Sequence, residues 1–152
     1  MNSMNLNLNL QKKNAAKKAA EYVKDGMLIG IGTGSTVFYL IDYLSERCKK
    51  GLKIKAVSSS IQSYAQAKKG GIPLANLKSV SSLDLTIDGA DEVDKQKRLI
   101  KGGGGALLRE KILAHASKKT LIIVDETKVV DTLGKAKLLS LIHISEPTRL
   151  GM

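Results

Sequence analysis

The sequence predicts an α/β domain in which a mostly parallel sheet is flanked by helices. Short apolar segments alternate along the chain with segments whose apolar residues recur at helical spacing. Clusters of glycine and small polar residues directly follow several of the predicted strands. Such alternation is typical of parallel sheets, whose sites lie beyond the carboxyl ends of the strands. We therefore expect a Rossmann-like domain with its site at that edge.

The first half of the chain is predicted to alternate helices and strands. The predicted helices cover residues 11–24, 36–49 and 61–69, and the predicted strands cover 27–32 and 53–58. Alanine and lysine favour the first helix, and Asp25-Gly26 is its expected end. The second helix is marked by apolar residues at helical spacing, namely Val37, Leu40, Ile41 and Leu44.

The second half continues the same alternation. A strand is predicted over 83–87, a helix over 106–117 and a further strand over 120–124. Polar or glycine-rich segments follow residues 32, 57, 87 and 124, each at the carboxyl end of a predicted strand. These segments are expected to meet at one edge of the sheet.

Composition and charge narrow the class of protein. Lys and Arg number 25 against 14 Asp and Glu in 152 residues, a net charge of +11, which favours anionic partners. The lysines are scattered and aromatic residues make up 3%, so we expect a phosphorylated small molecule and no nucleic acid. Cys48 is the only cysteine and His115 and His143 the only histidines, which disfavours disulfides and metal sites. No apolar run approaches the roughly 18 residues of a membrane span, and the start lacks signal-peptide features. We expect a soluble, cytoplasmic protein with no membrane partner.

The end of the chain does not fit this pattern. Residues 139–149 read LSLIHISEPTR, which can be reverse-translated into the end of a transposon adapter used to prepare sequencing libraries. We therefore expect an incomplete α/β domain over residues 1–138 and a non-native tail over 139–152. A natural strand followed by a turn at Pro147 is the alternative.

The glycine turn after the first predicted strand resembles a nucleotide loop but departs from it in detail. Counted from Gly30, the sixth position of the dinucleotide pattern is Ser35 rather than glycine, and no lysine completes a P-loop. Backbone N–H groups and the hydroxyls of Ser35 and Thr36 suit a phosphate group at a helix N-terminus. The alternative is that one of these hydroxyls only caps the helix.

Two further segments carry charged groups suited to acid–base work. Asp88 and Asp91 stand at the end of a predicted strand, where they could converge on a polar ligand or Asp88 could form an Asx turn. Four glycines follow Lys101, which suits a backbone nest for an anion.

Glu110 and Lys128 are also candidate site residues. The helical neighbours of Glu110 at both i−4 and i+4 are alanines, so a partly apolar setting should raise its pKa, as a general base requires. The alternative is pairing with a basic residue from elsewhere in the fold. Lys128 follows a predicted strand and is either a phosphate ligand or a solvated loop residue.

Taken together, the motifs GIGTGST, AVSSS, DGADEVD, KGGGGALLREK and DETK resemble ribose-5-phosphate isomerase of the A type. The resemblance runs from about Lys12 to Gly134. It implies interconversion of ribose 5-phosphate and ribulose 5-phosphate in the pentose phosphate pathway, without metal or organic cofactor. It also implies a homodimer in the complete protein. A fourth glycine, Gly105, stands where the family pattern suggests a small residue such as alanine.

The resemblance also assigns roles to individual residues. Glu110 would be the proton acceptor, Lys101 would lie near the developing negative charge, and Asp88 and Asp91 would hold and open the sugar. The substrate-binding residues it implies are Thr33, Gly34, Ser35, Thr36, Asp88, Gly89, Ala90, Asp91, Lys101, Gly102, Gly103, Gly104, Lys128 and Lys12.

The resemblance also implies a part that this sequence does not contain. The family chain continues into a small α+β lid domain and then returns to the main sheet, and we expect the chain as written to be poorly folded and nearly inactive without it. A non-catalytic sugar-phosphate sensor of related fold is the alternative function. Such a sensor needs no general base, so the presence of Glu110 argues against it.

Overall fold

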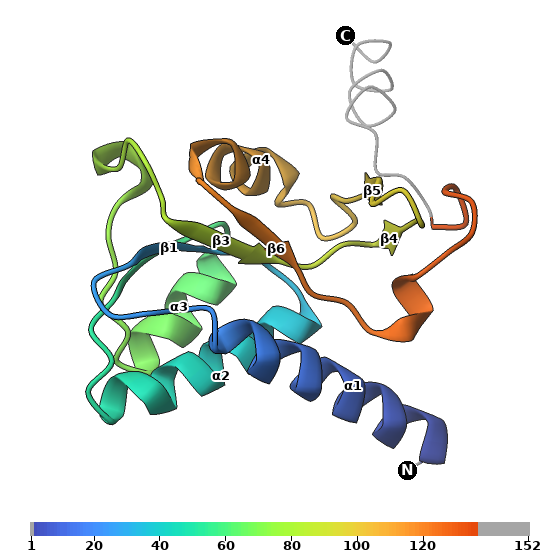
Figure 1. The fold of residues 1–152 in the computed structure, drawn as a ribbon, viewed down its shortest axis with the longest axis horizontal. Coiled ribbons are helices and arrows are strands. Elements are labelled where there is room, and N and C mark those ends of the chain that lie inside the picture. The colour runs from blue at the N-terminus through green and yellow to red at the C-terminus, as the bar shows by residue number, and fades with distance from the viewer. Residues whose placement is uncertain (1, 137–152) are drawn as a thin grey trace, which may run out of the picture.

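The computed structural model describes residues 2–136, which form a four-stranded sheet with helices on both faces (Figure 1). The strands are β1 Leu28–Ile31, β2 Lys55–Ser58, β3 Leu85–Asp88 and β6 Thr120–Ile122. Their order is β2-β1-β3-β6 and every neighbouring pair is parallel, which confirms the predicted sheet. Strand order reverses between β1 and β3, because the chain adds β2 on one side of β1 and β3 on the other.

Apolar side chains cover both faces of this sheet, as a parallel sheet requires. The helices are α1 Ser3–Ala20, α2 Ser35–Lys49, α3 Ile61–Lys69 and α4 Leu107–Ala116. In Figure 1, α1, α2 and α3 lie on one side of the sheet and α4 on the other. Ile29 and Ile31 of β1 are buried in the same cluster as Leu40 and Ile41 of α2. Leu113 of α4 packs in a smaller cluster with Val57.

The first helix differs most from its predicted span. It covers Ser3–Ala20 rather than 11–24, so the Asn–Leu segment at the start of the chain is helical. It also ends before Asp25-Gly26, because the chain turns after Ala20 and places Val23 fully inside the core. The remaining helices and strands begin and end within two residues of their predicted limits.

A small hairpin was not predicted. Strand β4, Glu92–Val93, pairs antiparallel with β5, Leu99–Ile100. Asp94 closes the turn, since its carboxylate accepts hydrogen bonds from the backbone N and the Nε of Arg98 at 2.9 and 2.6 Å. Lys97 adopts φ 63°, a left-handed conformation that usually marks glycine or asparagine. Two-residue strands joined by a turn without glycine leave no periodic pattern to recognise.

Two short 3-10 helices complete the described elements, at Leu77–Ser79 and Glu126–Lys128. In the described part of the chain, no helix combines the length and apolar character needed to cross a membrane. The predicted tail, residues 139–152, lies outside the described residues.

Candidate active site

The polar segments that follow the strands meet at one edge of the sheet, where strand order reverses. Ile31 of β1 is in register with Ile87 of β3, so Gly32 lies beside Asp88. The backbone N–H of Gly32 donates to Ile87 O at 2.9 Å and continues the ladder beyond the strand. This reversal point is where ligands bind in open α/β sheets.

Asp88 is the buried centre of the site, with 2% of its surface exposed. Its Oδ1 accepts hydrogen bonds from the backbone N–H of Thr33 at 3.1 Å and of Gly89 at 2.7 Å. Its Oδ2 lies 3.0 Å from Lys101 Nζ. Gly32 makes room for this carboxylate, since a Cβ there would lie 1.9 Å from Asp88 Oδ1. Asp88 thus bonds the backbone of its own turn, as the local alternative expected, and it also pairs with Lys101; its convergence with Asp91 on a ligand stays a prediction.

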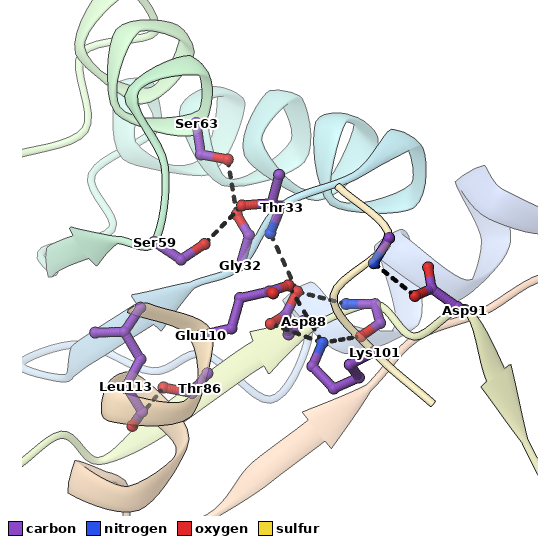
Figure 2. A network of polar contacts seen from close by, with 12 residues as sticks. Gly32, Thr33, Ser59, Ser63, Thr86, Asp88, Asp91, Lys101, Glu110 and Leu113 are labelled. Carbon is purple, nitrogen blue, oxygen red and sulfur yellow. Dashed lines mark hydrogen bonds and ion pairs between the residues drawn. The ribbon is translucent and has the colours of Figure 1, made fainter. Parts of the chain in front are cut away.

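Lys101 joins two carboxylates from different elements, as Figure 2 shows. Its Nζ lies 3.3 Å from Glu110 Oε1 and also donates to the carbonyl oxygen of Gly89. Glu110 is 7% exposed on α4. Burial raises the pKa of the Glu110 carboxyl above its ordinary value, the Asp88 carboxylate adds to the rise, and Lys101 opposes it. This direction agrees with the expected rise, and Glu110 also has a basic partner from another element, Lys101.

The unpredicted hairpin brings three charged residues to one end of a small sheet. Asp91 directly precedes β4 and Lys101 directly follows β5, and the antiparallel pairing of Glu92 with Ile100 places them opposite each other. Val129, which follows Lys128, forms a parallel bridge with Val93 on the other side of β4. Asp91 Oδ2 also accepts a hydrogen bond from Gly103 N at 2.8 Å, which fixes the glycine loop.

The loop between β1 and α2 is held by serines that were not predicted as site residues. Ser59 Oγ lies 2.7 Å from Thr33 Oγ1, and Ser63 Oγ donates to Gly32 O at 2.7 Å (Figure 2). The run of serines after β2 was the only signal for this support. Gly34, with φ 123°, is the N-cap of α2, so neither Ser35 nor Thr36 caps the helix through its side chain.

A cavity of about 130 Å³ lies at this edge. Nearly all of the predicted site residues line it, namely Thr33, Gly34, Ser35, Thr36, Gly89, Ala90, Asp91, Lys101, Gly102, Gly103, Gly104, Glu110 and Lys128. Val37, Ala106, Ile123 and Val124 add apolar surface. Asp88 is not among the lining residues and reaches the cavity through Lys101 and Thr33.

Lys12 is the one predicted residue that the structure does not bring to this site. It is absent from the cavity lining, and its Nζ lies 3.8 Å from Asp125 Oδ2. Asp125 in turn accepts a hydrogen bond from Thr127 N at 2.9 Å and caps the 3-10 helix that carries Lys128. Lys12 therefore contacts the turn that supports Lys128 and does not contact the cavity.

Comparison with known proteins gives consistent matches. The family model for ribose 5-phosphate isomerase A (phosphoriboisomerase A) matches residues 55–144. Ribose-5-phosphate isomerase A of Protochlamydia amoebophila is 57% identical over 124 residues, covering 82% of this chain and 53% of that protein. The same enzyme of Listeria innocua is 54% identical over 128 residues, covering 84% of this chain and 57% of that protein.

Solved structures give the same result. A ribose 5-phosphate isomerase from Plasmodium falciparum has a TM-score of 0.80 at 46% identity, over 83% of this chain and 55% of that chain. A D-ribose-5-phosphate isomerase in complex with phospho-erythronic acid has a TM-score of 0.81 at 43% identity, over 88% of this chain and 57% of that chain. The chain spans about half the length of the curated relatives it matches. With the family model matching more than half of its residues, the chain belongs to the ribose 5-phosphate isomerase A family.

Proposed function

We propose that this chain carries the catalytic domain of an enzyme that interconverts ribose 5-phosphate and ribulose 5-phosphate through an enediolate. The observation that carries the proposal is the placement of Lys101 Nζ between Asp88, at 3.0 Å, and Glu110, at 3.3 Å, beside the cavity. Family membership supplies the substrate class, a five-carbon sugar phosphate. The site supplies the groups that this reaction needs.

Glu110 is the proposed general base. Aldose–ketose isomerisation moves one proton between C2 and C1, and a single carboxylate can remove the proton from one carbon and return it to the other. A carboxylate accepts a proton more readily when its pKa lies closer to neutrality. The burial that raises the pKa of Glu110 therefore favours this role.

Lys101 and the glycine loop are proposed to stabilise the enediolate. Negative charge develops on oxygen as the proton leaves, and a fixed ammonium group with backbone N–H donors stabilises it. Loss of one such donor commonly costs about 3–4 kcal/mol of transition-state stabilisation. Gly102 adopts φ 101°, and a Cβ there would lie 3.0 Å from Leu107 Cδ2, so a side chain would strain the loop.

Asp88 and Asp91 are proposed to hold and open the sugar ring before isomerisation. The two carboxylates have separate environments, which suits separate tasks. Asp88 is buried and bonded to Lys101, whereas Asp91 lines the cavity and bonds Gly103 N. Ring opening requires a proton to move from O1 to the ring oxygen, which is acid–base work that a carboxylate at the cavity wall such as Asp91 can do.

The phosphate group is proposed to bind at the start of α2 and at Lys128. The first N–H groups of a helix have no partner within the helix and carry partial positive charge. The segment Thr33–Thr36 lines the cavity there and adds hydroxyl groups, and Lys128 lines it from the 3-10 helix that follows β6. In this proposal Lys12 acts indirectly, because it pairs with Asp125, whose carboxylate caps the 3-10 helix that carries Lys128.

We also propose that the complete enzyme works as a homodimer in the cytoplasm, without metal or organic cofactor, as the resemblance to the family implies. Its place in the pentose phosphate pathway follows from the substrate pair. Sedimentation analysis tests the dimer, and unchanged activity after dialysis against a chelator tests the absence of a metal requirement.

Turnover of ribose 5-phosphate is the direct test. It is measured for the 152-residue chain and for a completed enzyme, in which residues 1–136 are joined to the C-terminal half of the Protochlamydia amoebophila relative. Isomerisation that is lost in Glu110→Gln supports the proposal. Binding of ribose 5-phosphate without turnover in the completed enzyme contradicts it and favours the non-catalytic sensor.

A further inference from the structure

Glu92 is a buried carboxylate that the proposed reaction does not use. It follows Asp91 at the start of β4, and 3% of its surface is exposed. Its Oε2 accepts a hydrogen bond from Gly134 N at 2.7 Å, and its Oε1 accepts one from Ala136 N at 2.6 Å. These two hydrogen bonds compensate the buried carboxylate for the loss of its hydration. Both of its oxygens therefore bond the backbone of one segment that is distant in sequence.

The segment that Glu92 binds is the one that follows Lys128. Val129 forms a bridge with Val93, and Val130 N donates to Val93 O at 2.9 Å, which fixes the first residues after Lys128 on β4. Further along the chain, the backbone N–H groups of Gly134 and Ala136 donate to the carboxylate of Glu92, the residue before Val93 on β4. The segment 129–136 is thus fixed to β4 at both of its ends.

We call the two hydrogen bonds from Gly134 N and Ala136 N to the Glu92 carboxylate the clamp. The hydrogen bond from Gly134 N holds the pKa of the Glu92 carboxyl below its ordinary value, so the group is ionised at neutral pH and accepts charge-assisted bonds. By contrast, Asp131 in the same segment makes an exposed ion pair with Lys95 at 2.9 Å. Exposed pairs of this kind add little stability.

We propose that Glu92 is a positioning residue for phosphate binding, because its carboxylate holds the segment after Lys128 on β4 and so fixes Lys128 at the wall of the cavity. The proposal rests on the proposed function, in which Lys128 binds the phosphate group. It assigns Glu92 no contact with the substrate. Asp91, the residue before Glu92, belongs to the same strand start, so one short strand aligns the sugar end and the phosphate end of the site.

The test compares two carboxylate-to-amide variants in the completed enzyme. Glu92→Gln keeps the size of the side chain but presents an NH₂ group to one of two N–H donors, so the clamp is lost. We expect KM for ribose 5-phosphate to rise about tenfold, the effect of one lost charged contact, with kcat unchanged. Binding of unphosphorylated ribose should not change. Asp131→Asn is the matched control and should behave as the unmodified enzyme.

A double variant separates positioning from general loss of stability. If Glu92 acts through Lys128, adding Glu92→Gln to Lys128→Ala should not raise KM further, because the cation is already absent. An unchanged KM in Glu92→Gln would overturn the proposal. So would equal weakening of phosphorylated and unphosphorylated sugar, which would show that the residue acts only through folding.

Amide hydrogen exchange tests the clamp without any substitution. If the clamp fixes Lys128, binding of phosphate must in turn favour the clamped state. We expect ribose 5-phosphate to slow exchange of the Gly134 and Ala136 amides, and equal concentrations of ribose not to do so. Exchange at both amides that is the same with and without ribose 5-phosphate overturns the proposal even where Glu92→Gln does not fold.

The two proposals fail in different ways. An unmodified completed enzyme that neither binds nor isomerises ribose 5-phosphate contradicts the proposed function. An enzyme that does both, while Glu92→Gln retains its KM, contradicts only the positioning role of Glu92.

Discussion

Substitution of Gly32 by alanine should disable the site while leaving the fold in place. A Cβ at this position would lie 1.9 Å from Asp88 Oδ1, 2.1 Å from Asp88 Cγ and 2.6 Å from Asp88 Cβ. Non-bonded carbon atoms approach to about 3.5–4.0 Å, so the two Cβ atoms must separate by roughly 1 Å. Because the clash includes Asp88 Cβ, rotation of the carboxylate alone cannot relieve it.

The expected losses in activity and in stability follow from that displacement. Asp88 would move away from Thr33 N and Lys101 Nζ, which it now holds at 3.1 and 3.0 Å. A displacement of 1 Å in a reacting geometry can cost about 10²-fold in rate. An added methyl group in a packed interior typically costs about 1–3 kcal/mol of folding free energy. We therefore expect Gly32→Ala to lower kcat/KM by about 10²-fold or more.

A matched clash elsewhere in the chain provides the control. At Gly70, at the carboxyl end of α3, a Cβ would lie 2.0 Å from Ser45 Oγ and 2.7 Å from Ser45 Cβ, and neither residue lines the cavity. Turnover and thermal unfolding are measured for both variants in the completed enzyme. Gly70→Ala should lose comparable stability and keep its kcat. The reasoning is refuted if Gly32→Ala loses no more activity than Gly70→Ala.

Three other predictions concern Glu110 and Lys128. Glu110→Gln should lower kcat by at least about 10²-fold with little change in KM, and activity within about threefold of the parent would reject Glu110 as the base. The folded protein holds the Glu110 proton more tightly than the unfolded chain does, because burial raises the pKa above 4.5. Stability from this group is therefore complete below pH 4.5 and is lost as pH rises through the raised pKa. The unfolding temperature of Glu110→Gln relative to the parent should thus increase with pH, and a pH-independent difference would contradict this account. Lys128→Ala should raise KM for ribose 5-phosphate and leave weak binding of ribose unchanged, whereas equal effects on both sugars would place Lys128 at the sugar end.

The sequence predicted those parts of the site that follow long, regular elements. Apolar strands of ordinary length located the loops at the carboxyl edge, and the alanines flanking Glu110 indicated its partly apolar setting. The parallel register then brought Gly32 beside Asp88. Here local pattern and tertiary position agree, because a parallel strand delivers its following loop to one fixed edge.

The rest depends on contacts between residues that are distant in sequence. Lys101 reaches Glu110 from another element, and no helical spacing could reveal that pair. The β4–β5 hairpin is too short for periodicity, and Glu92 finds its partners more than 40 residues away. Lys12 was predicted to add a cation at the phosphate; its ammonium group lies 3.8 Å from Asp125 Oδ2, a contact across more than 100 residues that no local pattern reveals.

The geometry of the β4–β5 hairpin also places the residues of the site at one end and an exposed turn at the other. Asp91 and Lys101 flank the cavity end of the two strands, so residues 95–98 lie at the opposite end, where all of them are exposed. A fluorescent label attached at Gln96 would be part of the hairpin that carries Asp91 and Lys101, and it would not occupy the cavity. The exposed turn of the hairpin is thus a labelling position from which ligand binding at the site can be followed by fluorescence.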